Sequence, residues 1–370
     1  RGWQLEFNRR VMRGELSEIL GAATLDTDKL MRTLGIIGMA QKQFKGLSPA
    51  TQAALKAYSE GIQNAWQSGA VRPSPEFKIL GTVAGGPKGQ AWSPEDSLGW
   101  ALMMALDLGG NWGQEFARLS ASQVLNHEQL WQLLPPYPGE KPATAVDLPA
   151  LYAELGVYAP KDKTASTIVP APTALAQWSA DWVRDVGILE GKGSNNWVVA
   201  GSHTTSGKPL LANDPHLGLS APAIWYFASL QAPGMKVIGA TFPGLPFVVL
   251  GRTDKVAWGV TNTGPDVQDL YIEQLHPTEP AIYRVPDEDG KEMWARFKNR
   301  RHVIKVKGQP DVVFNVRSTR HGPVLTDAQM SHQDVLNTSK YVLALRWSAL
   351  DSDNQTIMAG VRSNGAQSVA

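Results

Sequence analysis

The sequence predicts an α+β fold, in which a helical first part is followed by a part rich in short strands. Residues 1–134 carry apolar side chains at helical spacing, whereas short β-rich runs dominate from residue 196 onward. Proline and glycine interrupt the chain between residues 135 and 171, as in a linker. Helices followed by many strands are typical of a layered α+β domain.

The helices of the first part are predicted from their start signals and apolar stripes. The chain opens inside an amphipathic pattern that runs from Leu5 to Leu20 without a capping residue before it. Ser48-Pro49 and Ser93-Pro94-Glu95-Asp96 each place a capping serine before a proline at the first helical position. The stripes that follow are Leu55, Tyr58, Ile62 and Trp66 in one helix, and Leu98, Ala101, Leu102, Ala105 and Leu108 in the other.

The second part is predicted to contain many short strands. Trp178, Trp182 and Val183 indicate one last helix, after which Trp197, Val198 and Val199 open a strand. Further strands are expected at 223–230, 235–241, 246–250, 256–260, 269–275, 301–307, 311–317 and 341–347.

Gly193-Ser194-Asn195-Asn196-Trp197 is the stretch most indicative of chemistry. A serine hydroxyl needs a base, yet no G-x-S-x-G motif and no local His and Asp surround Ser194. Cleavage of the Gly193–Ser194 bond would free an α-amine with a pKa near 8 on the same residue. Glycine at 193 would expose its carbonyl to the serine hydroxyl. An ordinary hairpin turn rich in Gly, Ser and Asn explains these five residues about as well.

Residues 194–275 resemble the start of the β-chain of the penicillin acylase family of N-terminal-nucleophile hydrolases. The matching segments are Ser194-Asn195-Asn196-Trp197, Leu211-Ala212-Asn213-Asp214-Pro215-His216, Phe242-Pro243-Gly244-Leu245-Pro246, Ala257-Trp258-Gly259-Val260-Thr261-Asn262 and Asp266-Val267-Gln268-Asp269. The resemblance extends to Arg9-Arg10, Met103–Leu108, His321-Gly322-Pro323-Val324 and Leu345-Arg346-Trp347.

The resemblance implies an αββα sandwich, and a precursor that cuts itself at Gly193–Ser194. It divides the chain into a helical α-chain region 1–134, a spacer 135–193, and the N-terminal part of the catalytic β-chain, 194–370. The family's penicillin, cephalosporin-type and acyl-homoserine-lactone acylases hydrolyse the amide of a small N-acyl compound, with α and β chains associated after cleavage. An inactive fragment, or a secreted binding module that keeps the fold, stays an alternative.

The resemblance also assigns roles beside Ser194. Asn262 matches the position whose backbone N–H stabilises the oxyanion, although turn chemistry at a strand end would also explain an asparagine there. His216 matches a residue beside the nucleophile and is expected to hold the Ser194 amine and hydroxyl in line. A proton shuttle, a metal ligand and a turn residue are other roles open to this histidine.

Asp266, the Gln268 carbonyl and Asp269 match calcium positions of the family, with Glu115 as the ligand from the α-chain. Such hard oxygen ligands suit Ca²⁺, whose role would be structural; a solvated acidic loop is the alternative. Met104, Leu108, Leu217 and Leu250 align with acyl-pocket positions, where leucines would favour an aliphatic acyl chain. Met and Leu at such spacing also serve as plain core.

Composition narrows the function classes. The 370 residues are 43% apolar with 13 tryptophans, enough to bury a large core. Lys and Arg number 35 against 34 Asp and Glu, which argues against nucleic acid or a membrane surface as partner. No cysteine is present, so disulfides and thiolate sites are excluded, and no apolar run is long enough for a membrane span. A phosphate-binding G-x-x-x-x-G-K-[ST] motif is absent.

The chain reads as a fragment truncated at both ends. It opens inside a helical pattern and stops within a stretch that resembles a continuing β-chain. No signal peptide is visible. Because family members are usually exported, the resemblance implies a periplasmic or secreted protein.

Overall fold

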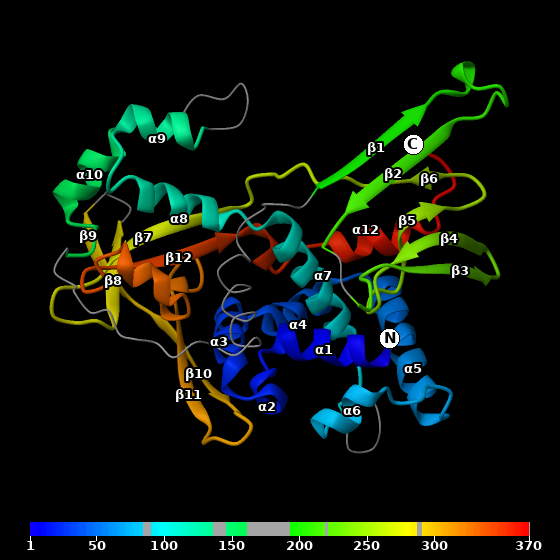
Figure 1. Cartoon of the computed structure of the whole chain (residues 1–370), viewed down its shortest axis with the longest axis horizontal. Helices are drawn as coiled ribbons and strands as arrows, with labels where there is room; N and C mark the ends of the chain where they lie inside the picture. Colours follow the sequence, from blue (N-terminus) through cyan, green and yellow to red (C-terminus); the bar gives the residue numbers. More distant parts are fainter. Residues whose placement is uncertain (84–89, 136–145, 161–192, 219–220, 287–290, 370) are drawn as a thin grey trace.

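The computed structural model describes residues 1–83, 90–135, 146–160, 193–218, 221–286 and 291–369. Helices occupy the first part of the chain and antiparallel strands most of the second, so the predicted α+β class is confirmed. The helices are α1 Gly2–Arg13, α2 Ser17–Leu20, α3 Leu25–Leu34, α4 Ile36–Gly46, α5 Pro49–Gln67, α6 Pro75–Leu80, α7 Pro94–Gly109, α8 Trp112–Ala121, α9 His127–Leu133, α10 Leu148–Leu155 and α12 Thr356–Ser363. Figure 1 shows α1, α3, α4 and α7 gathered at the centre of the molecule.

The first helix is shorter than the sequence predicts. The amphipathic pattern was expected to continue from Leu5 to Leu20, but α1 ends at Arg13 and α2 begins at Ser17. Gly14 ends α1 with φ of 63°, a left-handed conformation that glycine adopts without a Cβ penalty. The apolar residues after the end of α1 still face the core, because Leu16 and Ile19 are buried.

Both predicted helix starts are confirmed. Ser48 caps α5, since its side chain accepts a hydrogen bond from the Thr51 N–H. Ser93 and Asp96 form a reciprocal capping box at the start of α7. Asp96 is fully buried and also forms an ion pair with Arg13 at 2.7 Å, which fixes α7 against the end of α1.

Every predicted strand overlaps a strand of the structure. The strands are β1 Gly193–Val199, β2 Leu210–His216, β3 Tyr226–Ala232, β4 Met235–Thr241, β5 Val248–Arg252, β6 Ala257–Trp258, β7 Gln268–Gln274, β8 Ile282–Pro286, β9 Glu292–Arg296, β10 Lys298–Ile304, β11 Val312–Ser318 and β12 Tyr341–Trp347. They form a four-stranded sheet, β3-β4-β5-β6, and four antiparallel pairs: β1-β2, β7-β12, β8-β9 and β10-β11. The sequence did not predict β2, β8 or β9.

The β1-β2 hairpin carries the predicted cleavage site at its base. In its register Gly193 lies opposite His216 and Ser194 opposite Pro215. Proline donates no hydrogen bond and is tolerated in a strand only at such edge positions. The turn of the hairpin extends away from the body of the molecule, so the Ser194 end is the one nearest the other elements (Figure 1).

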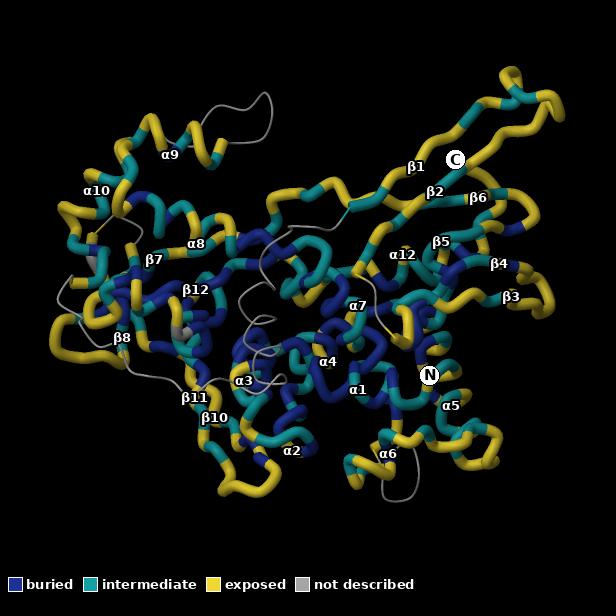
Figure 2. The backbone as a smooth tube through the Cα atoms, viewed as in Figure 1, coloured by how far each residue is buried: buried dark blue, intermediate teal, exposed yellow. Residues whose placement is uncertain are grey.

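The main hydrophobic core joins the helical and the stranded parts. Leu30, Leu55 and Leu106 come from helices, whereas Leu345 and Trp347 come from β12, and all five belong to one cluster of buried residues. Figure 2 shows the buried backbone concentrated around α1, α3 and α4 and along β12. Burial of this shared apolar surface holds the regions before and after residue 193 together.

The predicted spacer is described only in part. Residues 136–145 and 161–192, including the helix predicted around Trp178, lie outside the described residues. Within the spacer, α10 begins after Asp147, whose side chain accepts from the Ala150 N–H. Among the residues that the structure describes, every helix is too short or too polar to cross a membrane.

Candidate active site

Ser194 is the second residue of β1 and contacts the loop that follows β6. The backbone N–H of Asn262 donates to Ser194 Oγ at 2.9 Å. The predicted nucleophile and the predicted oxyanion donor, which are 68 residues apart in the sequence, therefore lie side by side. A donor at this distance from the attacking oxygen is also near the carbonyl oxygen of whatever that oxygen attacks.

Thr261 makes two hydrogen bonds to the same serine, and sequence reasoning assigned it no role. Its hydroxyl donates to the Ser194 carbonyl oxygen at 2.8 Å, and Ser194 Oγ lies 2.7 Å from Thr261 Oγ1. Because a carbonyl can only accept, the Thr261 proton is committed to that bond. With the Thr261 proton on that carbonyl, the Ser194 hydroxyl is free to donate to Thr261 Oγ1.

Asn213 on β2 holds the hairpin against the loop after β6. Its Nδ2 donates to the Asn195 carbonyl at 2.9 Å and to the Val260 carbonyl at 3.0 Å, while its Oδ1 accepts from the Val260 N–H at 3.0 Å. Gly259 allows this contact, since a Cβ there would lie 2.8 Å from Asn213 Oδ1. The side chain thus sets the position of Ser194 relative to Asn262.

His216 lies beside Gly193, at the predicted cleavage bond. Two ring atoms of His216 are 3.3 Å from the place where a Cβ on Gly193 would sit, so a larger residue at 193 would crowd the ring. The Nδ1 atom of this half-exposed ring pairs with Asp214 Oδ2 at 3.2 Å rather than with the Ser194 hydroxyl. His216 is therefore near the predicted cleavage bond, and its role stays a prediction.

A cavity of about 620 Å³ opens between α7, the loop after β6 and α12. Met104, Leu108 and Asn262 all line it, so two of the predicted acyl-contacting residues lie beside the predicted oxyanion donor. Asn262 Nδ2 also donates to the Leu108 carbonyl. Leu217 and Leu250 are not among the lining residues; Leu217 packs against the main core and Leu250 lies in β5.

Three of the predicted metal ligands converge. One carboxylate oxygen from each of Glu115, Asp266 and Asp269 lies within 4.8 Å of the others. The pKa of Glu115 is raised to about 7, mainly by burial and also by the charges of Asp269 and Asp266, while the hydrogen bond from the Leu270 N–H acts to lower it. Burial and then Asp266 also raise the pKa of Asp269. This crowding of carboxylates is unfavourable without a cation.

Gln268 connects this cluster to the start of α8. Its side-chain oxygen accepts from the backbone N–H groups of Asn111 at 2.6 Å and Trp112 at 3.2 Å. Its backbone carbonyl, the predicted ligand atom, accepts from Asn111 Nδ2 at 3.1 Å, and the same Nδ2 donates to Asp266 Oδ1 at 2.6 Å. The buried Oδ1 of Asn111 has no partner among the described residues. An oxygen atom without a donor beside three carboxylates fits a cation site.

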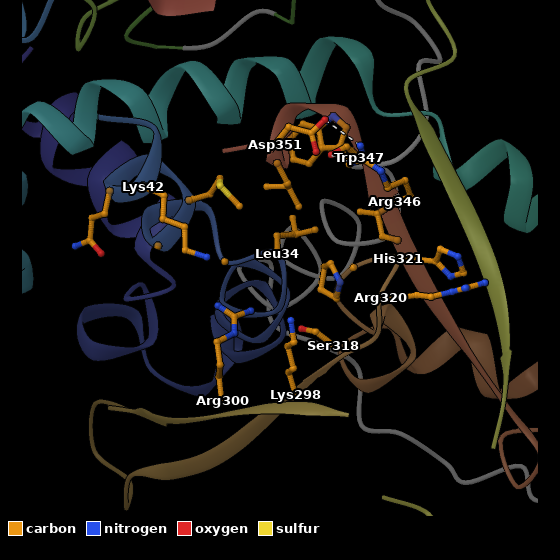
Figure 3. A pocket seen from close by; sticks show the side chains of 18 of the residues that line it. Leu34, Lys42, Lys298, Arg300, Ser318, Arg320, His321, Arg346, Trp347 and Asp351 are labelled. Atoms are coloured by element: carbon orange, nitrogen blue, oxygen red, sulfur yellow. Dashed lines mark hydrogen bonds and ion pairs between the residues drawn. The ribbon is translucent and has the colours of Figure 1, made fainter. Parts of the chain in front are cut away.

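A second cavity, of about 930 Å³, is strongly basic (Figure 3). Six cationic side chains line it: Lys42, Lys45, Lys298, Arg300, Arg320 and Arg346. Among the described residues that line it, Asp351 is the only one with a carboxylate, which accepts from Arg346 at 2.9 Å. Trp347 and Asp351 line both cavities, so the basic cavity adjoins the one beside Asn262.

Comparison with known proteins shows which family this sequence matches. The profile of the penicillin amidase family matches residues 1–370. The acyl-homoserine lactone acylase QuiP of Pseudomonas aeruginosa is 32% identical over 342 residues, covering 91% of this chain and 38% of the relative. The penicillin acylase 2 proenzyme of Pseudomonas sp. (strain SE83) is 32% identical over 332 residues, covering 87% and 39%.

A solved structure, the thermostable penicillin G acylase from Alcaligenes faecalis, superposes with a TM-score of 0.40 at 27% identity, over 46% of this chain and 29% of that chain. The chain spans less than two fifths of the curated relatives named above. The family match over residues 1–370 confirms the resemblance carried by the Ser194 and Asn262 motifs. This chain belongs to the penicillin amidase family.

Proposed function

We propose that the whole protein is an N-acyl amide hydrolase that cuts its own chain at Gly193–Ser194. The observation that carries the proposal is the 2.9 Å hydrogen bond from the Asn262 N–H to Ser194 Oγ, directly after a glycine where a Cβ would lie 3.3 Å from the His216 ring. A nucleophile and a fixed hydrogen-bond donor beside it are parts that acyl transfer requires.

In the uncut chain the Ser194 nitrogen is an amide and has no basicity. Ser194 Oγ attacks the Gly193 carbonyl carbon, the bond to the Ser194 nitrogen breaks, and the hydroxyl proton ends on that nitrogen. Water then hydrolyses the resulting ester, which leaves a carboxylate on Gly193 and a free hydroxyl on Ser194. The product amine, with an ordinary pKa near 8, is the base for turnover.

Turnover repeats the same steps on an external amide. Ser194 Oγ attacks the acyl carbonyl, its own α-amine takes the hydroxyl proton and passes it to the leaving amine, and water releases the acyl group. The Asn262 N–H stabilises the negative oxygen in both halves of the reaction. Thr261 keeps the hydroxyl oriented, because it accepts the Ser194 proton in the resting state.

The acyl group is expected to occupy the cavity lined by Met104 and Leu108. Both side chains are aliphatic, and the cavity reaches Asn262, so an aliphatic acyl chain could extend from the reacting carbonyl into it. The relatives are named acyl-homoserine lactone acylase and penicillin acylase, which supports a small N-acyl compound as substrate. We propose that the protein acts in the periplasm or outside the cell, as expected for the family.

We propose that a structural Ca²⁺ binds the carboxylates of Glu115, Asp266 and Asp269. The converging oxygens, the raised pKa of Glu115 and the unpartnered Asn111 oxygen support this ligand set. A divalent ion there would join α8 to β7, that is, the α-chain region to the β-chain region. The shared core of helices and β12 would keep the two chains associated after cleavage.

Intact mass and N-terminal sequencing of the expressed full-length parent test the proposal. We expect two chains, one beginning at Ser194, and release of amine from an N-acyl compound. Ser194→Ala should stay uncut and inactive, whereas Ser194→Cys should cut but turn over poorly. Ser206→Ala, an exposed serine in the turn of the same hairpin, is the matched control and should behave as wild type. A single uncut chain without activity would favour the binding-module alternative.

A further inference from the structure

The lining of the basic cavity has a much higher positive charge than the protein as a whole. The formal net charge of the whole protein is only +1, yet six cationic residues and one carboxylate are among the described residues that line this single cavity. Arg346 is the one whose charge is compensated, by Asp351 at 2.9 Å. Within the part of the chain that the structure describes, the other five have no carboxylate partner.

The spacing of the cations along α4 and β10 places each pair on one face of its helix or strand. Lys42 and Lys45 on α4 are three residues apart, which places them on one helix face. Lys298 and Arg300 on β10 are two apart and share one face of the strand. Like charges at such spacing repel each other, and all four residues line the same cavity. Figure 3 shows Lys42, Lys298 and Arg300 around it.

Arg300 is built into the wall of the cavity. Its Nη2 donates to the Thr33 carbonyl at 3.2 Å, and its guanidinium lies against Gly35. A Cβ at residue 35 would be 2.7 Å from Nη1, and Gly35 also has a φ of 70°, so glycine is what lets the guanidinium approach the backbone. Partial burial of the guanidinium lowers the pKa of Arg300, although the residue as a whole stays exposed to solvent.

We propose that this cavity binds a small anion that carries two or more negative charges on carboxylate or phosphate groups. Guanidinium groups pair with both kinds of anion through parallel N–H bonds, and lysines add point charges. A volume of about 930 Å³ is within the range of small-molecule sites. The bound anion compensates the two like-charged pairs, of which Arg300 is one member, and competes with Asp351 for Arg346.

Titration of the full-length parent with citrate and, separately, with pyrophosphate tests the proposal. Ionic strength is held constant with NaCl, and the readouts are tryptophan fluorescence, because Trp347 lines the cavity, and the Tm. We expect saturable binding of at least one probe. Tighter binding of citrate would indicate a site for carboxylates, and tighter binding of pyrophosphate a site for phosphates. The double variant Lys298→Gln, Arg300→Gln should weaken binding at least tenfold.

The matched control is Lys305→Gln, which removes an exposed cation near the end of β10 that pairs with Glu18 and does not line the cavity. It should bind as wild type does. If the double variant fails to fold, Lys42→Gln with Lys45→Gln, both exposed on α4, should give the same weakening. The proposal is overturned by the absence of saturable binding with both probes, or by equal affinities in the cavity variants and Lys305→Gln.

Discussion

Removal of the Thr261 hydroxyl is the substitution that tests the geometry of the nucleophile most selectively. Thr261→Val keeps the shape of the side chain but deletes the acceptor of the Ser194 proton and the donor to the Ser194 carbonyl. Freed from its acceptor, the hydroxyl samples three staggered positions, a factor of roughly 3 in rate. Loss of the hydrogen bond to the Ser194 carbonyl raises the activation free energy by about 1 kcal/mol. Together these predict a kcat about 10- to 30-fold lower.

The assay separates a positioning role from a structural one. KM should stay unchanged because Thr261 contacts Ser194 and not the substrate, and Thr261→Ser should restore kcat to within about threefold. Thr241→Val is the matched control, since the Thr241 hydroxyl donates to the Tyr226 carbonyl at the same 2.8 Å but does not contact the nucleophile. Wild-type kcat in Thr261→Val, or an equal loss in both valine variants, would refute the reasoning.

The remaining predictions concern the metal, the acyl cavity and acid stability. Ca²⁺ at a hundredfold excess over its Kd should increase the free energy of unfolding by about 2.7 kcal/mol, which is measured as a higher Tm. If Ca²⁺ raised the Tm of Asp269→Asn by as much as that of the wild type, the ligand set would be contradicted. Leu108→Trp should shift the amide preference toward shorter acyl chains, measured as kcat/KM across a chain-length series, and an unaltered order would exclude Leu108 from the acyl site. Burial lowers the pKa of His332 to about 3 from an unfolded value of 6.5, so the folded state binds fewer protons between these values. The contribution of His332 to the free energy of unfolding is fully present above pH 6.5, and the free energy should fall by up to about 4 kcal/mol as the pH decreases toward 3. His332→Phe, which keeps a ring beside Phe116, should flatten that part of a denaturant–pH profile; an unchanged slope would contradict it.

The elements that the sequence predicted correctly are those with strong local signals. Ser93 and Asp96 cap α7 as their spacing requires, and the apolar β12 is a strand as expected. β2 was missed because Asn213, Asp214 and Pro215 resemble a turn; pairing with β1 and the Asn213 bonds make it a strand. Such pairing is tertiary and leaves no local pattern.

The candidate site was predictable to a similar degree. The resemblance to the penicillin acylase family assigned Ser194 and Asn262 to one site, and the structure places the Asn262 nitrogen 2.9 Å from Ser194 Oγ. The role of Thr261 depends on two hydrogen bonds across 67 residues, and neither spacing nor composition signals it. The sequence did not predict the basic cavity, because its cations come from separate elements in a chain whose total charge is +1.

The proposed chemistry depends on the α-amine of Ser194 once the preceding peptide bond is broken. At about pH 7, acetylation favours an α-amine with a pKa near 8 over lysines near 10.4, so the new terminus can be blocked selectively. Amine release from an N-acyl compound is then compared before and after blocking, with the modified site verified by mass spectrometry. We predict that hydrolysis is abolished; full turnover by protein acetylated at Ser194 would contradict the mechanism.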